Sequence, residues 1–114
     1  MRYDAAMEDV LQRVGLTTAG VEAFCLKYQV ARFELFGSVL RDDFDEQSDL
    51  DVLITFRDDR TGDLLDALLD MEDELAAATG RHVDVVERRL VEKNPNWIRR
   101  NAILNSAQVV YAAA

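Results

Sequence analysis

The chain of 114 residues is long enough for one hydrophobic core and too short for two, so we expect a single domain over residues 1–114. Hydrophobic residues make up 49% of it and charged residues 31%, which is typical of a folded protein and excludes a disordered one. Acidic residues outnumber basic ones 22 to 13, giving a net charge of −9. This balance disfavours a nucleic-acid partner, whose phosphates need Lys and Arg, and suits divalent cations or a basic protein partner.

No apolar stretch approaches the ~20 residues that cross a bilayer, and the N-terminus is polar and acidic. We therefore expect no membrane partner and a cytoplasmic location. Cys25 is the only cysteine, which excludes an intramolecular disulfide and a cysteine-based zinc cluster. Apolar and aromatic residues surround it at helical spacing, so we predict a buried structural thiol.

The first quarter of the chain predicts two helices. Apolar residues recur at helical intervals over residues 3–14, and Gly15 follows where a helix can stop. Thr17 or Thr18 can cap a second helix that runs to about Tyr28.

Strands follow on both sides of an acidic connection. Residues 31–36 alternate between apolar and polar or aromatic side chains, as a half-buried strand would, and end at Gly37-Ser38. A second strand is predicted over residues 49–56. Its two faces carry Leu50, Val52, Ile54 and Phe56 on one side, and Asp49, Asp51, Leu53 and Thr55 on the other.

The second half alternates between helices and strands. Asp63 can cap a long helix that ends at Gly80, and residues 82–86 form a third apolar run. The predicted buried stripe of that helix is Leu64, Leu65, Leu68, Met71 and Leu75. Asn94-Pro95 is a good helix start, and residues 108–111 fit a last strand. The packing face of this last helix is predicted as Trp97, Ile98, Ala102 and Ile103. The order indicates an α/β or α+β arrangement around a small sheet.

Three aspartates carry the chemistry. Asp49 and Asp51 lie two apart in a strand and so point to the same face, with Cα atoms roughly 6 to 7 Å apart. A cation between them would turn repulsion into coordination, and Mg²⁺ or Mn²⁺ prefers oxygen ligands. Asp84 lies in the third apolar run and joins the cluster if the two strands are neighbours. The alternative is that Asp49 and Asp51 only begin a strand at a solvated edge.

Gly37-Ser38 can supply the phosphate-binding half of such a site. Glycine lets the backbone approach a ligand, while the Ser38 hydroxyl and the free N–H groups of a following helical turn can donate to phosphate oxygens. Arg41 lies one turn further on and could provide a cation to a triphosphate. A Gly-Ser pair alone is only a turn signal, and it gains weight from the aspartates that follow.

Two other metal-dependent sites fit the sequence poorly. A phosphatase of the haloacid dehalogenase type needs a glycine and a threonine right after the second aspartate, where this chain has Val52 and Leu53. An EF-hand loop would need a central glycine and a glutamate at its twelfth position, and residues 42–51 lack them.

The combined motif resembles the minimal nucleotidyltransferase family of the DNA polymerase beta superfamily. The resemblance lies in residues 36–41 (FGSVLR), 48–54 (SDLDVLI) and 83–86 (VDVV). It implies a nucleotidyltransferase fold with a small mixed sheet flanked by helices. Gly37 and Ser38 would hold the nucleotide's phosphates, and Asp49, Asp51 and Asp84 would form the catalytic metal site, with two Mg²⁺ ions and ATP as substrate.

Small single-domain members of that family act as antitoxins beside a HEPN-domain toxin, in what are called type VII pairs. The resemblance therefore implies transfer of AMP from ATP to a tyrosine of such a partner. A non-catalytic antitoxin that masks its partner by binding is the alternative, because a fold does not establish an activity.

The sequence departs from the family at the residue after Arg41, where many relatives have glycine. This chain has Asp42 there, followed by Asp43, Asp45 and Glu46, which can face solvent or a basic partner. The same two options hold for the acidic face of the helix over residues 63–79.

His82, the only histidine, is either structural or a group that touches substrate. Four further arginines form local pairs that are either solvated surface or candidate contacts to phosphate or partner. They are Arg88, Arg89, Arg99 and Arg100.

Overall fold

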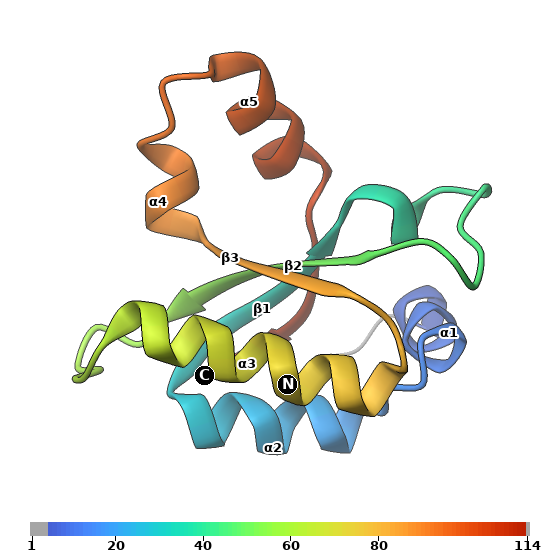
Figure 1. Cartoon of the computed structure of the whole chain (residues 1–114), viewed down its shortest axis with the longest axis horizontal. Helices are drawn as coiled ribbons and strands as arrows, with labels where there is room; N and C mark the ends of the chain where they lie inside the picture. The colour runs from blue at the N-terminus through green and yellow to red at the C-terminus, as the bar shows by residue number, and fades with distance from the viewer. Residues whose placement is uncertain (1–4, 114) are drawn as a thin grey trace.

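The computed structural model describes residues 5–113, which form a four-stranded sheet. Helices lie on both of its faces (Figure 1). The strands are β1 (Val30–Phe36), β2 (Leu50–Phe56), β3 (Val83–Glu87) and β4 (Gln108–Ala112). They lie in the order β3-β2-β1-β4. β2 and β3 are parallel, and the other two pairs are antiparallel. The predicted mixed sheet is therefore confirmed. That residues 1–114 form one domain stays a prediction.

Within residues 5–113, six helical segments connect or flank these strands. They are α1 (Ala5–Arg13), α2 (Thr18–Tyr28), the 3-10 turn η1 (Gly37–Leu40), α3 (Leu64–Thr79), α4 (Arg88–Glu92) and α5 (Trp97–Ser106). The predicted start of the first helix at Tyr3 lies outside the described residues. Within the described part of the chain, no helix is both long enough and apolar enough to cross a membrane.

Capping residues set the helix ends where the sequence predicts them. The Thr17 hydroxyl accepts a hydrogen bond from the Gly20 amide at 3.0 Å, and Asp63 accepts one from the Asp66 amide at 2.9 Å. Gly80 ends α3 with a left-handed φ of 68°, a conformation that glycine adopts without steric cost. Local sequence therefore decides both ends of α3 and the start of α2.

Two layers of helices cover the sheet. α2 and α3 lie on one face and α4 and α5 on the other (Figure 1). The larger core lies under α2 and α3 and contains Phe33, Leu35, Val52, Ile54 and Met71. The smaller one comprises Phe36, Leu53, Val91 and Ile103. Cys25 is buried in the larger core, where desolvation raises the pKa of its thiol to about 12, so the predicted structural role is confirmed.

The second helical layer corrects the prediction that β1 is half-buried. Its face toward α4 and α5 was expected to be solvated, yet Glu34 is only 2% exposed and Phe36 only 7%. The segment over residues 88–92, which was not predicted as a helix, forms α4 and helps to cover this face. The alternation along β1 therefore separates two cores, not a core from solvent.

The N-terminal part of α5 also differs from expectation. Its cap is Asn96, whose side chain accepts a hydrogen bond from the Arg99 amide at 3.2 Å, and not Asn94. Asn94 instead forms a turn with its Oδ1 accepting from the Asn96 amide. The predicted packing face is wrong for Trp97 and Ile98, which are 61% and 65% exposed, and also for exposed Ala102. Ile103 is buried as predicted.

The predicted stripe of α3 needs one correction. Leu68, Met71 and Leu75 are buried, whereas Leu65 is 64% exposed. Glu72 of α3 accepts a hydrogen bond from the Val85 amide at 2.9 Å. It thereby satisfies a backbone donor on the outer side of β3, which is an edge strand.

Candidate active site

Parallel pairing of β2 with β3 brings two of the predicted aspartates together. Asp51 and Asp84 are register partners on the two neighbouring strands, which are about 4.8 Å apart in such a sheet. Both belong to the sheet face that carries α4 and α5, because their neighbours in sequence point into the larger core. Neither carboxylate has a hydrogen bond or ion pair within the described part of the chain.

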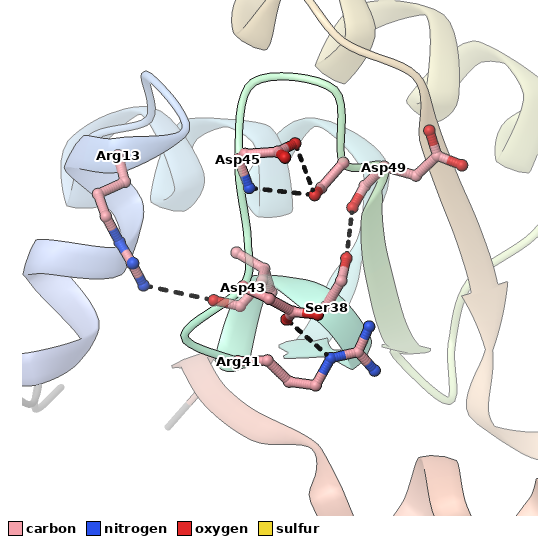
Figure 2. A network of polar contacts seen from close by, with 8 residues as sticks. Arg13, Ser38, Arg41, Asp43, Asp45 and Asp49 are labelled. Carbon is pink, nitrogen blue, oxygen red and sulfur yellow. Dashed lines mark hydrogen bonds and ion pairs between the residues drawn. The ribbon is translucent and has the colours of Figure 1, made fainter.

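Asp49 lies immediately before β2 and is held through its backbone. The Ser38 hydroxyl donates to the Asp49 carbonyl oxygen at 3.1 Å, which fixes η1 to the start of β2 (Figure 2). The Asp49 carboxylate is exposed and points away from Ser38, with its Oδ2 3.5 Å from Nδ1 of His82. His82 is thus beside the site, on the side of Asp49 away from η1.

Gly37 is in direct contact with the Asp51 carboxylate. Its φ of +76° is a left-handed conformation that L side chains rarely adopt. A Cβ built at this position would lie 2.4 Å from Oδ2 of Asp51, closer than real Cβ contacts occur. Any larger residue would therefore have to displace the carboxylate, and glycine is required here both by the turn and by the site.

Arg41 follows η1 and lies near these groups. Its Nε is 3.2 Å from Oδ1 of Asp43, in an exposed pair that solvent screens strongly (Figure 2). Arg41 lines the same cavity as Gly37. All six predicted site residues therefore lie at one end of the sheet, around η1, β2 and β3.

The acidic connection after Arg41 is held by an arginine that sequence reasoning missed. Nη1 of Arg81 donates to the carbonyl oxygens of Ser48 at 2.8 Å and Asp45 at 3.1 Å. The Arg81 guanidinium also lies 4.5 Å from the ring centroid of Phe44. Since Ser48 precedes Asp49, this clamp positions the first aspartate from the start of β3. No local motif marks Arg81.

The acids of this connection are exposed, which both options left open by the sequence, solvent and a basic partner, require. These residues are Asp42, Asp43, Asp45 and Glu46. Arg13 of α1 donates to the Val39 carbonyl oxygen of η1, the turn that precedes the connection, at 3.4 Å (Figure 2).

The electrostatics of the site converge on Asp51. Partial burial raises the pKa of its carboxyl above 3.8, and the neighbouring charges of Asp84 and Asp49 raise it further. Arg99 and His82 act in the opposite direction. A carboxylate that is desolvated and repelled by two others gains most from a bound cation.

We expect Asp51→Asn to make the metal-free protein slightly more stable at neutral pH. Folding raises the pKa of Asp51 above its ordinary value of 3.8, so the folded state holds this proton more tightly than the unfolded state. The free energy of unfolding therefore falls as the pH rises from 3.8 through the pKa of the folded state. Asparagine carries no charge, so the variant lacks this loss. The gain should stay below about 1 kcal/mol, because solvent screens a partly exposed group.

Urea denaturation between pH 3 and 8 in the presence of a chelator measures this effect. The two proteins should be equally stable at the acid end and diverge toward neutral pH. Asp42→Asn, on the exposed connection, is the matched control and should follow the unmodified protein. A variant less stable than the parent at pH 7 would contradict the electrostatic assignment.

The donor set suits Mg²⁺, although its members are not drawn together. Among residues 5–113, no three Asp, Glu, His or Cys side chains are already grouped to hold a metal ion. Asp51 and Asp84 are nevertheless adjacent, unpaired oxygen donors, and Asp49 is near enough to influence Asp51. Hard cations prefer such ligands, and the exposed Asp49 side chain can change rotamer without backbone movement.

Comparison with known families decides what this geometry belongs to. Residues 20–110 match the sequence model of the nucleotidyltransferase domain. The matched residues make up more than half of the chain. The chain belongs to the nucleotidyltransferase family. The matched range contains every predicted site residue, from Gly37 to Asp84. None of the curated proteins compared with the chain matches it.

Solved structures agree with this membership. A structure provisionally described as a minimal nucleotidyltransferase is 31% identical to this nucleotidyltransferase domain, with 80% of this chain and 86% of the other covered and a TM-score of 0.59. A toxin–antitoxin structure with AMP-PNP is 18% identical, covering 86% and 75%, with a TM-score of 0.64. A third match is a chain in the structure of a tri-AMPylated Shewanella oneidensis HEPN toxin in complex with MNT antitoxin. It is 17% identical, with 84% of this chain and 70% of the other covered and a TM-score of 0.56. The last two show a shared fold.

Proposed function

We propose that this chain is a Mg²⁺-dependent nucleotidyltransferase that moves AMP from ATP to a tyrosine hydroxyl of a HEPN-type toxin. It would act as the antitoxin of a type VII pair. The observation that carries the proposal is the juxtaposition of Asp51 and Asp84 beside Gly37, in a chain of this family. The neighbours with AMP-PNP and with a tri-AMPylated toxin support the choice of nucleotide and acceptor.

Each site residue has a role in this proposal. The backbone at Gly37 and the Ser38 hydroxyl bind the phosphates, and Arg41 neutralises part of their charge, since its pair with Asp43 is weak and exposed. Ser38 would keep Asp49 in place until nucleotide enters, through the hydrogen bond to its carbonyl. Bound Mg²⁺ would lower the pKa of the attacking hydroxyl and neutralise the leaving group.

The three aspartates would bind the metal, and one of them would accept the proton of the acceptor tyrosine. Asp49, Asp51 and Asp84 would be the ligands, with Asp84, the exposed member on β3, nearest to an incoming acceptor. The tyrosine oxygen bonds to the α-phosphorus of ATP while the bond from that phosphorus to the bridging oxygen breaks. Pyrophosphate leaves, and the tyrosine proton passes to the Asp84 carboxylate and then to water. We place this reaction in the cytoplasm.

A second candidate is an antitoxin that acts by masking its partner without catalysis. It is favoured by one observation, that the three carboxylates are not grouped and Asp49 is directed toward His82. In that case Asp49 and His82 would form part of the surface that binds the partner and would take no part in catalysis.

The deciding experiment combines the purified protein with Mg²⁺, labelled ATP and the product of the adjacent gene. The catalytic proposal expects label and the mass of one or more AMP units on that product, and no transfer in the presence of a chelator. Repeating the reaction with GTP, CTP and UTP measures nucleotide preference. A stable complex without transfer from any of the four nucleotides would establish masking and reject catalysis.

A further inference from the structure

The wall of the site opposite η1 is formed by α5. A cavity of about 700 Å³ lies between the two, within the range of roughly 300 to 1,000 Å³ that small-molecule sites occupy. On the η1 side it is lined by Gly37, Leu40 and Arg41, and on the α5 side by Ile98, Arg99 and Ile103. The cavity thus begins at the glycine that contacts Asp51 and extends away from the sheet.

The cavity has an apolar part and a cationic part. Phe36, Leu40, Ile98 and Ile103 supply a surface on which a flat base can rest. The two cations, Arg41 and Arg99, come from opposite walls. A ligand with one apolar aromatic end and one polyanionic end fits this division.

Arg99 differs from the other arginines of the C-terminal half. The guanidinium of Arg100 donates to the Asn94 carbonyl oxygen at 3.1 Å, Arg88 pairs with Glu34, and Arg89 pairs with Asp58. Within the described residues, the Arg99 guanidinium has no hydrogen bond or ion pair, and it is within electrostatic reach of Asp51. In an acidic protein, a cation that faces a cavity without a partner is available for an anion.

We propose that Arg99 is a second phosphate-binding cation, which holds the polyphosphate of a nucleoside triphosphate against η1 from the α5 side. This inference rests on the proposed nucleotidyl transfer and adds a residue outside the motif that predicted it. Arg99 and Arg41 would then grip the polyphosphate between two walls, while the apolar lining accepts the base. A guanidinium suits this task because it can donate two parallel hydrogen bonds to phosphate oxygens.

Calorimetric titration of the full chain in Mg²⁺ with ATP, ADP, AMP and adenosine tests the proposal without any partner protein. Arg99→Gln should weaken ATP binding by about tenfold or more and leave adenosine binding unchanged. Arg99→Lys keeps the charge and should recover part of the loss. Arg89→Gln, an exposed cation on α4 paired with Asp58, is the matched control and should bind all four ligands like the parent.

The outcomes separate this inference from the function on which it rests. An unmodified protein that binds ATP, with Arg99→Gln binding it equally well, would overturn the role of Arg99 and leave the proposed function intact. Equal losses for ATP and adenosine would also overturn it, because they indicate a change in cavity shape. An unmodified protein that binds no nucleoside triphosphate would overturn both proposals.

Discussion

Replacing both Asp49 and Asp51 with asparagine is expected to reduce nucleotidyl transfer by at least about 1,000-fold while the protein stays folded. The change removes the negative charge that would hold the cations and keeps the shape of both side chains. Asp51 is a desolvated carboxylate repelled by its neighbours, so its neutral replacement should not destabilise the fold. Transfer is measured as labelled AMP on the partner, and folding by circular dichroism and thermal denaturation.

The matched control exchanges two acids that lie outside the site. Asp42→Asn with Glu46→Gln removes the same charge from the exposed connection and should keep most of the transfer activity. Co-expression with the toxin adds a test in cells. If catalysis silences the toxin, the Asp49 and Asp51 variant should still bind it and fail to restore growth. Unchanged transfer by this variant would reject the site, and restored growth without transfer would favour masking.

The largest effect on stability is expected at Glu34. Its side chain is 3% exposed and lies between two arginines, with Oε1 2.6 Å from Nη2 of Arg88 and 3.3 Å from Nε of Arg32. Nε of Arg88 is itself buried with no hydrogen-bond partner. Glu34→Ala would leave the part-buried Arg88 charge without its carboxylate, which costs about 3 to 5 kcal/mol. For a domain of this size the midpoint of thermal unfolding should fall by more than about 10 °C.

Replacing both partners should cost much less than replacing one. In Glu34→Leu with Arg88→Met, neither member of the pair leaves an unpaired buried charge, and such exchanges are often neutral or stabilising. Asp58→Ala, which breaks the exposed pair with Arg89, should leave the unfolding midpoint unchanged. Denaturation of the single and double variants forms a mutant cycle. Equal stability of Glu34→Ala and the parent would show that the ion pair carries no net energy.

Periodicity and capping in the sequence were sufficient for most of the elements. The caps at Thr17 and Asp63 and the stop at Gly80 were predicted because they depend on hydrogen bonds and dihedral angles within a few residues. The strands were predicted because their apolar alternation has a period of two. The cap of α5 was misplaced by two residues, because Asn94 and Asn96 are both good caps and Pro95 is compatible with either.

Burial on the second face of the sheet could not be predicted in the same way. Glu34 is a polar residue in an alternating strand and therefore suggested a solvated face. Its burial depends on Arg88, which is 54 residues away in the chain, and on the unpredicted α4. Conversely, Trp97 and Ile98 are apolar at helical spacing and are exposed, so helical periodicity did not identify which side of α5 packs on the sheet.

Residue types at short spacings were enough to predict the fold class and the family, and to select the three aspartates as candidates. The adjacency of Asp51 and Asp84 became visible in the folded chain, since it follows from the parallel register of β2 and β3. The fold likewise shows that Gly37 touches Asp51, that Arg81 holds the connection before Asp49, and that Arg99 faces the cavity from α5. These contacts join residues that are 14 to 62 positions apart, a separation at which residue spacing carries no information about contact, and only the packing of the sheet and its helices brings them together.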